Sequence, residues 1–244
     1  MQTEASSRHD GRAFGQSRSL SFTREVVTTA QGSCLVQVGN TKVLCTATVE
    51  NGVPGWLDGK RKGWVGAEYA LLPTSCSRRV PREHGKRKGR SMEIERLIGR
   101  SLRMAVDLQM LGEHTVTVDC DVIQADGGTR TASICGGWVA LHDALMAAVE
   151  DGRIARLPLT RQVAAISVGK VGGELMVDLD YVEDSHAEVD LNLVCSSENQ
   201  LIEVQGTGER ACFTPQELST MVDLAQPTIE KILDLQNQVT GFKE

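Results

Sequence analysis

Aromatic side chains are scarce in this chain, and common nucleotide-binding patterns are missing. Only 4% of the 244 residues are Phe, Trp or Tyr, which leaves few platforms on which nucleic-acid bases could stack. The sequence contains neither GxxxxGKS/T nor GxGxxG, the two glycine-rich patterns that hold nucleotide phosphates in widespread folds. These absences exclude a recognisable P-loop or dinucleotide-binding enzyme.

Paired cysteines and long apolar runs are lacking as well. The seven cysteines are an odd number, scattered without a CxxC pair, and most fall in apolar runs where a free thiol behaves as a small hydrophobe. This usage favours a reducing compartment over a disulfide framework or a zinc site. The polar start MQTEASSRHDGR has no apolar export signal, and no apolar run approaches the ~20 residues that span a bilayer. We expect a cytoplasmic protein without a membrane partner.

Positive charge is in the minority but unevenly distributed. The chain has 26 Lys and Arg against 32 Asp and Glu, for a net charge of -6, which argues weakly against a nucleic-acid partner. One stretch nevertheless holds seven of the 26 basic residues: Arg78, Arg79, Arg82, Lys86, Arg87, Lys88 and Arg90. A basic cluster can bind phosphates even in an acidic protein, and a solvated loop is equally compatible with the pattern.

Hydrophobic periodicity predicts strands interspersed with helices. Strand-type patterns cover residues 33–38, 42–49, 64–72, 114–123, 163–168, 174–179, 188–195 and 201–205. Helical patterns cover residues 91–111 and 131–149, and a third helix begins at a capping box, Thr214-Pro215-Gln216-Glu217. No low-complexity linker divides the chain. We predict an α+β fold, a single compact domain over residues 1–244 with a mixed β-sheet and packed helices, in which residues 1–7 are disordered.

The corner QADGGTRTA, between a predicted strand and a predicted helix, is the first candidate site. Gly127 and Gly128 allow a sharp turn and the close approach of an anion. A helix that starts there directs unpaired N–H groups and its positive dipole end outward. Thr129 adds a hydroxyl, and Arg130 adds a forked donor suited to phosphate. An ordinary corner capped by Thr129 or Thr131 fits the same spacing.

An acidic segment is the second candidate site. Asp190 and Asn192 share one face of a predicted strand. Asp184 lies in the turn that precedes this strand, so its carboxylate can fold back toward Asp190. Neighbouring carboxylates repel each other and raise each other's proton affinity, unless a hard cation such as Mg²⁺ lies between them. A hydrated acidic turn is the alternative interpretation.

Several long blocks of the chain resemble the ribonuclease PH family. They are HDGR, GNTKVLCTATVE, GWVGAEYALLP, GRSMEIERLIGRSLR, DCDVIQADGGTRTASI, DLDYVEDSHAEVDLNLV and IEVQGTGE. The similarity extends from about residue 8 to the last predicted helix, and the blocks occur in the family's order. The resemblance implies the ribonuclease PH fold, which is like that of the second domain of a small-subunit ribosomal protein.

The activity implied by this resemblance is phosphate-dependent 3′→5′ exoribonuclease activity, a nucleotidyl transfer to inorganic phosphate as co-substrate. The family trims transfer RNA precursors and other RNAs, ribosomal RNA included, and releases nucleoside diphosphates. Its phosphate-binding residues match Arg90, Gly128, Thr129 and Arg130.

The catalytic and metal-binding acids of the family match Asp184 and Asp190, so the resemblance implies that both bind Mg²⁺ and act in catalysis together with Arg130. We further hypothesise that Asp184 protonates the leaving 3′-oxygen, because a turn residue has more freedom to approach it.

RNA contact in the family comes from the basic loop, where Arg79 and Arg82 match two contacting arginines and Arg78 is a neighbouring candidate. A third family position is Thr74 here, and the loop is slightly shorter than the best-known bacterial pattern. Members form rings of six as a trimer of dimers, so a homo-oligomeric ring is the expected assembly.

Two other functions compete with this interpretation. One is a catalytically inactive RNA-binding ring subunit of the same superfamily, which would lack the phosphate arginines or the acids. Arg90, Arg130, Asp184 and Asp190 are all present. The other is a small-molecule phosphotransferase, which would carry a glycine-rich nucleotide loop of its own.

Overall fold

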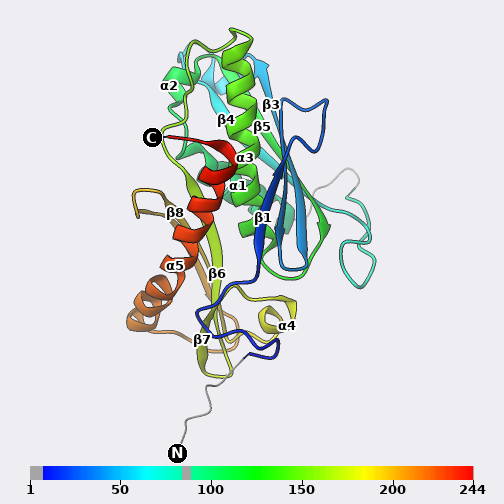
Figure 1. Ribbon diagram of the computed structural model, residues 1–244, viewed down its shortest axis with the longest axis vertical. Helices are drawn as coiled ribbons and strands as arrows, with labels where there is room; N and C mark the ends of the chain where they lie inside the picture. The colour runs from blue at the N-terminus through cyan, green and yellow to red at the C-terminus, as the bar shows by residue number, and fades with distance from the viewer. Residues whose placement is uncertain (1–7, 84–88, 244) are drawn as a thin grey trace, which may run out of the picture.

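Two β-sheets and the helices packed on them make up the fold of this chain (Figure 1). A computed structural model describes residues 8–83 and 89–243. The larger sheet has five strands in the order β1-β2-β3-β5-β4, and the smaller has four in the order β7-β6-β8-β9. β4 and β5 pair in parallel while the other pairs are antiparallel. The predicted α+β class with a mixed sheet is therefore confirmed.

The element bounds agree closely with the predicted ones in most places. The strands are β1 (Leu20–Arg24), β2 (Gly32–Val38), β3 (Thr41–Asn51), β4 (Trp64–Leu71), β5 (His114–Gln124), β6 (Val163–Val171), β7 (Glu174–Val177), β8 (Val189–Ser196) and β9 (Leu201–Gly208). The helices are η1 (Gly55–Leu57), α1 (Gly89–Arg103), α2 (Leu108–Leu111), α3 (Thr129–Glu150), α4 (Tyr181–Asp184) and α5 (Pro215–Thr240). The predicted disorder of residues 1–7 concerns a segment outside the described residues.

Helix α3 is the centre of the hydrophobic core. It contacts β2 and β3 of the larger sheet and β6 of the smaller one, and one cluster of buried apolar side chains extends through both sheets. Gly136 permits the close approach, because a Cβ atom there would lie 2.5 Å from Cγ1 of Val36 and 3.0 Å from Sγ of Cys45. The number of domains stays a prediction, but this core is continuous from one sheet to the other.

The apolar composition of α3 reflects this position. Among the described residues, α3 is long and apolar enough to cross a membrane by length and composition, a property that we did not predict. Its burial explains the composition, since 78% of its most apolar 18-residue window is inside the protein. Helices that are apolar all round are typical of the core of larger proteins.

The prediction of one helix over residues 91–111 is wrong. Helix α1 ends at Arg103, and Val106 then forms an isolated antiparallel bridge with Leu159. The side chain of Asp107 accepts hydrogen bonds from the backbone N–H groups of Gln109 and Met110 and so begins the separate short helix α2. The bridge to the distant residue Leu159 therefore interrupts a sequence whose local pattern is helical.

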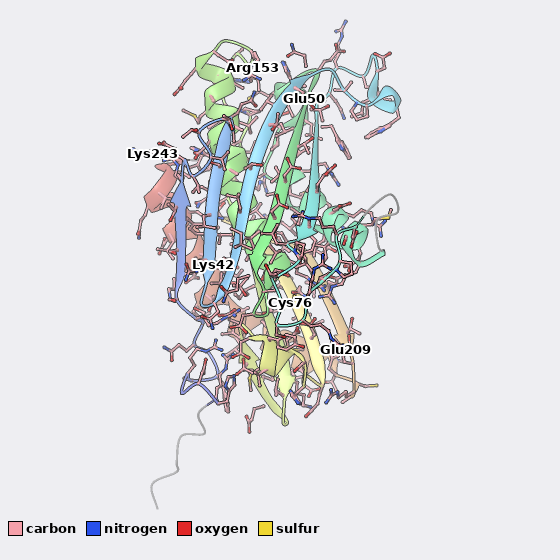
Figure 2. The ribbon with its side chains drawn as sticks, turned by 90° about the vertical axis from the view of Figure 1, so that its right-hand side faces the viewer. Lys42, Glu50, Cys76, Arg153, Glu209 and Lys243 are labelled. Atoms are coloured by element: carbon pink, nitrogen blue, oxygen red, sulfur yellow. The ribbon has the colours of Figure 1, made fainter. Side chains whose placement is uncertain are left out.

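The ends of other elements follow their local sequence signals. Thr214 and Glu217 form the predicted capping box at the start of α5. The hairpins β2–β3 and β6–β7 form around the predicted turns. Strand β1 was not predicted from the sequence. Figure 2 shows the face of the larger sheet that α3 does not cover, with Lys42 and Glu50 labelled at opposite ends of β3.

Candidate phosphate and metal site

The corner between β5 and α3 has the conformation that an anion site requires. Gly127 and Gly128 both adopt positive φ angles, +73° and +67°, which glycine reaches without steric cost. Gly128 is the N-cap of α3, and no side chain caps this helix start. The alternative of a cap by Thr129 or Thr131 is therefore wrong. The N–H groups of the first turn remain available to a ligand.

The side chain of Arg18 holds this corner in place. Its guanidinium donates to the backbone carbonyls of Asp126 and Gly127 and to both carboxylate oxygens of Asp178, at 3.0 Å from Nε and 2.7 Å from Nη2. Asp178 is 1% exposed. The hydroxyl of Thr41 donates to the Gly127 carbonyl at 2.7 Å and accepts from the Asp126 N–H at 2.9 Å. The corner thus has little freedom to move.

Gly127 also brings the corner against the segment that carries the acidic residues. A Cβ atom on Gly127 would lie 2.7 Å from the carbonyl carbon of Asp180, so only glycine permits this backbone-to-backbone contact. Asp180 is the N-cap of α4, and Asp184 ends this one-turn helix. Asp184 therefore lies, as predicted, in the turn that precedes β8, and this turn is helical.

The four charged residues singled out in the sequence lie together. Arg130 interacts electrostatically with both Asp184 and Asp190, and Arg90 interacts with Asp184. Arg90 is in the first turn of α1, Arg130 in the first turn of α3, and Asp190 in β8. Two helix starts, the end of α4 and the start of β8 therefore converge, although they come from three separate parts of the chain.

The two carboxylates differ in environment. Burial, together with the neighbouring Asp184, raises the pKa of Asp190 to about 6, and Arg130 and an amide of Asn192 only partly oppose this. Partial desolvation also raises the pKa of Asp184, against the effects of Arg130 and Arg90. Asp184 is nevertheless exposed to solvent. As predicted, Asn192 shares the strand face of Asp190, with Nδ2 3.5 Å from its Oδ2.

These acids fit a divalent cation by the chemistry of their oxygens. Burial raises the proton affinity of both carboxylates, and the charge of Asp184 adds to that of Asp190. A cation that neutralises such a pair stabilises it, and Mg²⁺ needs only one or two protein carboxylates beside waters and phosphate oxygens. A different acidic group, His9 with Asp180 and Glu183, has ligand atoms within 4.8 Å of one another. There Glu183 already accepts from Arg8 and Arg12, which leaves less of its charge for a metal.

Thr129 is joined to the core through Tyr69. The hydroxyls of Tyr69 and Thr129 lie 2.8 Å apart. Burial raises the pKa of Tyr69, whereas Arg90 and Arg130 act in the opposite direction. Because the Thr129 hydroxyl already has this partner, its backbone N–H is the more available group. Sequence patterns did not single out Tyr69, which is 60 residues distant from its partner.

The basic loop lies beside the same site. Its backbone pairs with the end of β5, where the Ala125 N–H donates to the Ser75 carbonyl at 2.8 Å. Figure 2 shows Cys76 of this loop over the lower part of the larger sheet. Arg78, Arg79 and Arg82 are all exposed. Lys86, Arg87 and Lys88 lie outside the described residues.

A cavity of about 700 Å³ opens between this loop, the start of α1 and the strands β4 and β5. Arg82 and Arg90 line it together with the carboxylates of Asp119 and Asp121. Burial raises the pKa of Asp121, and Arg82 opposes this shift. Arg82 therefore faces the cavity near acids of the sheet, whereas Arg78 and Arg79 are not among the residues that line it.

The family follows from comparison with known proteins. The model of the first domain of the 3′ exoribonuclease family matches residues 16–147, and that of the second domain matches residues 161–227. The chain belongs to the 3′ exoribonuclease family. The resemblance to ribonuclease PH is thereby confirmed, and the corner, both arginines and both aspartates fall within the matched residues.

Several solved structures share the fold of this chain. One is described as the Archaeoglobus fulgidus exosome with RNA bound to the active site, with a TM-score of 0.80, 24% identity and coverage of 93% of this chain and 91% of the other. Rice (Oryza sativa) Rrp46 has a TM-score of 0.77 and 20% identity, with 96% and 100% covered. An archaeal exosome core has a TM-score of 0.76 and 23% identity, with 95% and 90% covered. At these identities the likeness shows the fold.

Sequence reasoning missed two residues, Arg8 and Arg12, that hold the acidic segment of the candidate site. Arg8 and Arg12 are buried and donate to the backbone and carboxylates of the segment before β8, including the Val177 carbonyl at 2.6 Å and the Asp178 carbonyl at 3.0 Å. The block HDGR was noted only as part of a resemblance. Arg12, which ends this block, and Arg8, which precedes it, both neutralise the buried carboxylate of Glu183.

We expect Gly127→Ala to destabilise the protein by about 3 kcal/mol, because it combines a positive φ angle with a clash against backbone. The matched control is Gly172→Ala, whose φ is +60° but whose Cβ would meet open space, so its cost should be about 1 kcal/mol. Urea unfolding of both variants measures this. Equal losses of unfolding free energy in the two variants would contradict the close contact between Gly127 and the backbone at Asp180.

Asp190 should make folding stability depend on pH in the absence of divalent cations. Its pKa of about 6 exceeds the ordinary aspartate value of about 4, so the folded state holds the proton more tightly than the unfolded chain. The Asp190 contribution therefore falls as pH rises from about 4 to about 7. We would measure the unfolding free energy of the wild type and of Asp190→Asn in the presence of a chelator. As pH rises, the wild type should lose stability relative to the variant. Asp223→Asn, at an exposed position of α5, serves as the control. If the difference in unfolding free energy between the wild type and Asp190→Asn stays constant with pH, the raised pKa of Asp190 is refuted.

Proposed function

We propose that this protein is a phosphate-dependent 3′→5′ exoribonuclease that trims the 3′ ends of transfer RNA precursors and of other RNAs, and releases nucleoside diphosphates. The observation that carries the proposal is the convergence of Arg90, Arg130, Asp184 and Asp190 where the starts of α1 and α3 meet. Family membership supports the reaction class. The choice of transfer RNA precursors rests on the resemblance to ribonuclease PH.

The cationic half of the site fits an inorganic phosphate as attacking group. An oxygen of the phosphate attacks the terminal phosphodiester phosphorus, and the bond from that phosphorus to the 3′-oxygen of the preceding nucleotide breaks. Both phosphates are anions, so the attacking one must be held against repulsion. Arg90 and Arg130 provide forked donors, and Gly128 and Thr129 provide the free N–H groups of the α3 start. Transfer of this type depends mainly on positioning and charge stabilisation.

Asp184 and Asp190 are the residues that would hold Mg²⁺. A bound Mg²⁺ supplies positive charge next to the scissile phosphate and the departing 3′-oxygen. A proton competes with the cation for Asp190, whose pKa is about 6, so activity should decline in acid. The raised pKa also makes Asp190 a better proton-holding group than Asp184, which we favoured from sequence because of its place in a turn.

The exposed arginines of the basic loop are the proposed RNA contacts. Arg78, Arg79 and Arg82 lie on the surface beside the site, where they can bind the phosphates of a 3′ tail without reading its bases. An oligomeric ring would bring several such loops together. We propose a homohexamer, supported by the similarity in fold to exosome core proteins, and a sedimentation mass of six times 26.4 kDa would test it. A cytoplasmic location is part of the same proposal.

The direct test is product analysis with a short 3′-labelled RNA. With phosphate and Mg²⁺, the purified protein should release nucleoside diphosphates; without phosphate, release should stop. Asp190→Asn should abolish release at saturating phosphate, because the substitution removes the negative charge of one of the two carboxylates proposed to hold Mg²⁺. Nucleoside monophosphates formed without phosphate would falsify phosphorolysis, and absence of any release would support an inactive RNA-binding subunit instead.

Substitutions of two arginines should separate phosphate binding from RNA binding. Arg130→Ala should raise the KM for phosphate at least about ten-fold, because charge-assisted hydrogen bonds are lost, and should leave RNA affinity without phosphate nearly unchanged. Arg79→Ala should weaken RNA binding and reduce the slope of log K against log salt by about 0.7, as expected for one lost single-strand phosphate contact. Steady-state kinetics and RNA titrations at several salt concentrations measure both. If both variants changed the KM for phosphate and the affinity for RNA in the same way, the separate roles proposed for Arg130 and Arg79 would be contradicted.

A further inference from the structure

The side chain of Arg130 is held by an amide from the smaller sheet. Its Nη1 donates to Oε1 of Gln205 at 3.2 Å, and Nε2 of Gln205 donates to Oε1 of Glu93 at 2.7 Å. Arg130 Nη1 is 4.0 Å from the same Glu93 oxygen. Arg130 belongs to α3, Gln205 to β9 and Glu93 to α1. One hydrogen-bonded relay therefore links three elements at the proposed phosphate site.

The orientation of the Gln205 amide is determined by its partners. A guanidinium is a donor only, and an ionised carboxylate is an acceptor only. The amide oxygen must therefore face Arg130, and the amide nitrogen must face Glu93. The reverse orientation would lose both hydrogen bonds. Glu93 thus fixes the direction in which Gln205 presents its oxygen.

The same relay connects the two arginines of the site. Glu93 lies three residues after Arg90 in α1, on the same side of the helix, and through Gln205 it reaches Arg130 at the start of α3. The strand position of Gln205 is itself fixed, since it pairs with Asn192 of β8. We propose that Gln205, oriented by Glu93, is a positioning residue that sets the place of Arg130 relative to Arg90 and thereby determines the affinity for inorganic phosphate. This inference rests on the proposed function.

A neutral amide suits this task better than a carboxylate. A hydrogen bond from a guanidinium to an amide restrains the side chain but leaves its full positive charge for a ligand. A carboxylate at the same distance would form an ion pair that competes with phosphate for the guanidinium. Glu93, at 4.0 Å, is beyond direct hydrogen-bond distance from Arg130 Nη1. The hydrogen bond that positions Arg130 therefore comes from a neutral amide, and the ion pair with Glu93 is long.

The test compares Gln205→Ala, Gln205→Glu and a matched control in the full-length protein. The control is Glu203→Ala, because Glu203 is two residues earlier on β9 and contacts the same helix, with Oε2 3.1 Å from Nε of Arg100. Both alanine variants remove one link between β9 and α1, but only Gln205 contacts Arg130. Inorganic phosphate is the probe. The measurements are its Kd by calorimetry, its KM in RNA degradation, and RNA affinity without phosphate.

We expect Gln205→Ala to raise the Kd and KM for phosphate about ten-fold, as for a lost hydrogen bond to a charged group, with RNA affinity unchanged and kcat at saturating phosphate reduced less. Gln205→Glu should raise the Kd for phosphate as well, although it keeps the shape of the side chain. Glu203→Ala should leave phosphate affinity unchanged. A split between KM and kcat distinguishes positioning from a general loss of structure.

Three results would overturn the proposal: wild-type phosphate affinity in Gln205→Glu, wild-type affinity in a folded Gln205→Ala, or an equal loss in Glu203→Ala. If Gln205→Ala does not fold, the phosphate affinity of Gln205→Glu, which keeps the shape of the side chain, decides the role of Gln205. If the wild type degrades no RNA with phosphate, the proposed function fails, and the calorimetric Kd values still decide the role of Gln205. A wild type that binds no phosphate at all would overturn both.

Discussion

The contact between the Gly127–Gly128 corner and the backbone at Asp180 is the constraint on which the site depends. It places the start of α3, with its free N–H groups and Arg130, beside the short helix that ends in Asp184. Arg18 fixes the contact from the other side through Asp178 and two carbonyls of the corner. Without a bare glycine at this point, the anion-binding half and the acidic half of the site would separate.

Opposite charges at short range suit the site to the phosphate binding and cation binding that we propose for it. Arg90 and Arg130 favour the ionised forms of the aspartates, whereas burial and mutual repulsion favour protonation and leave Asp190 with a pKa of about 6. The acids are therefore ready to bind a cation but are not neutralised by the arginines. The arginines in turn keep charge for a phosphate, in part because the direct partner of Arg130 is the neutral amide of Gln205.

Local signals made much of this structure predictable. The glycine corner, the strand face shared by Asp190 and Asn192, and the capping box at Thr214 each depend on neighbours within a few residues. The break between α1 and α2 depends on a bridge from Val106 to Leu159, and the partner of Arg130 is 75 residues away. Periodicity and spacing carry no information about such pairs. That the acids and arginines would meet came from a family resemblance, not from the residues themselves.

The pairing of the first described residues with a distant segment bears on the order in which the chain folds. Arg8 binds Glu183 across 175 residues of sequence, and Arg18 binds Asp178 across 160. During synthesis from the N-terminus, these arginines have no acid partner until about three-quarters of the protein has left the ribosome. Contacts between such distant residues form late because long loops must close first. The nascent chain therefore cannot assemble the site before the segment that carries Asp178 and Glu183 has been synthesised.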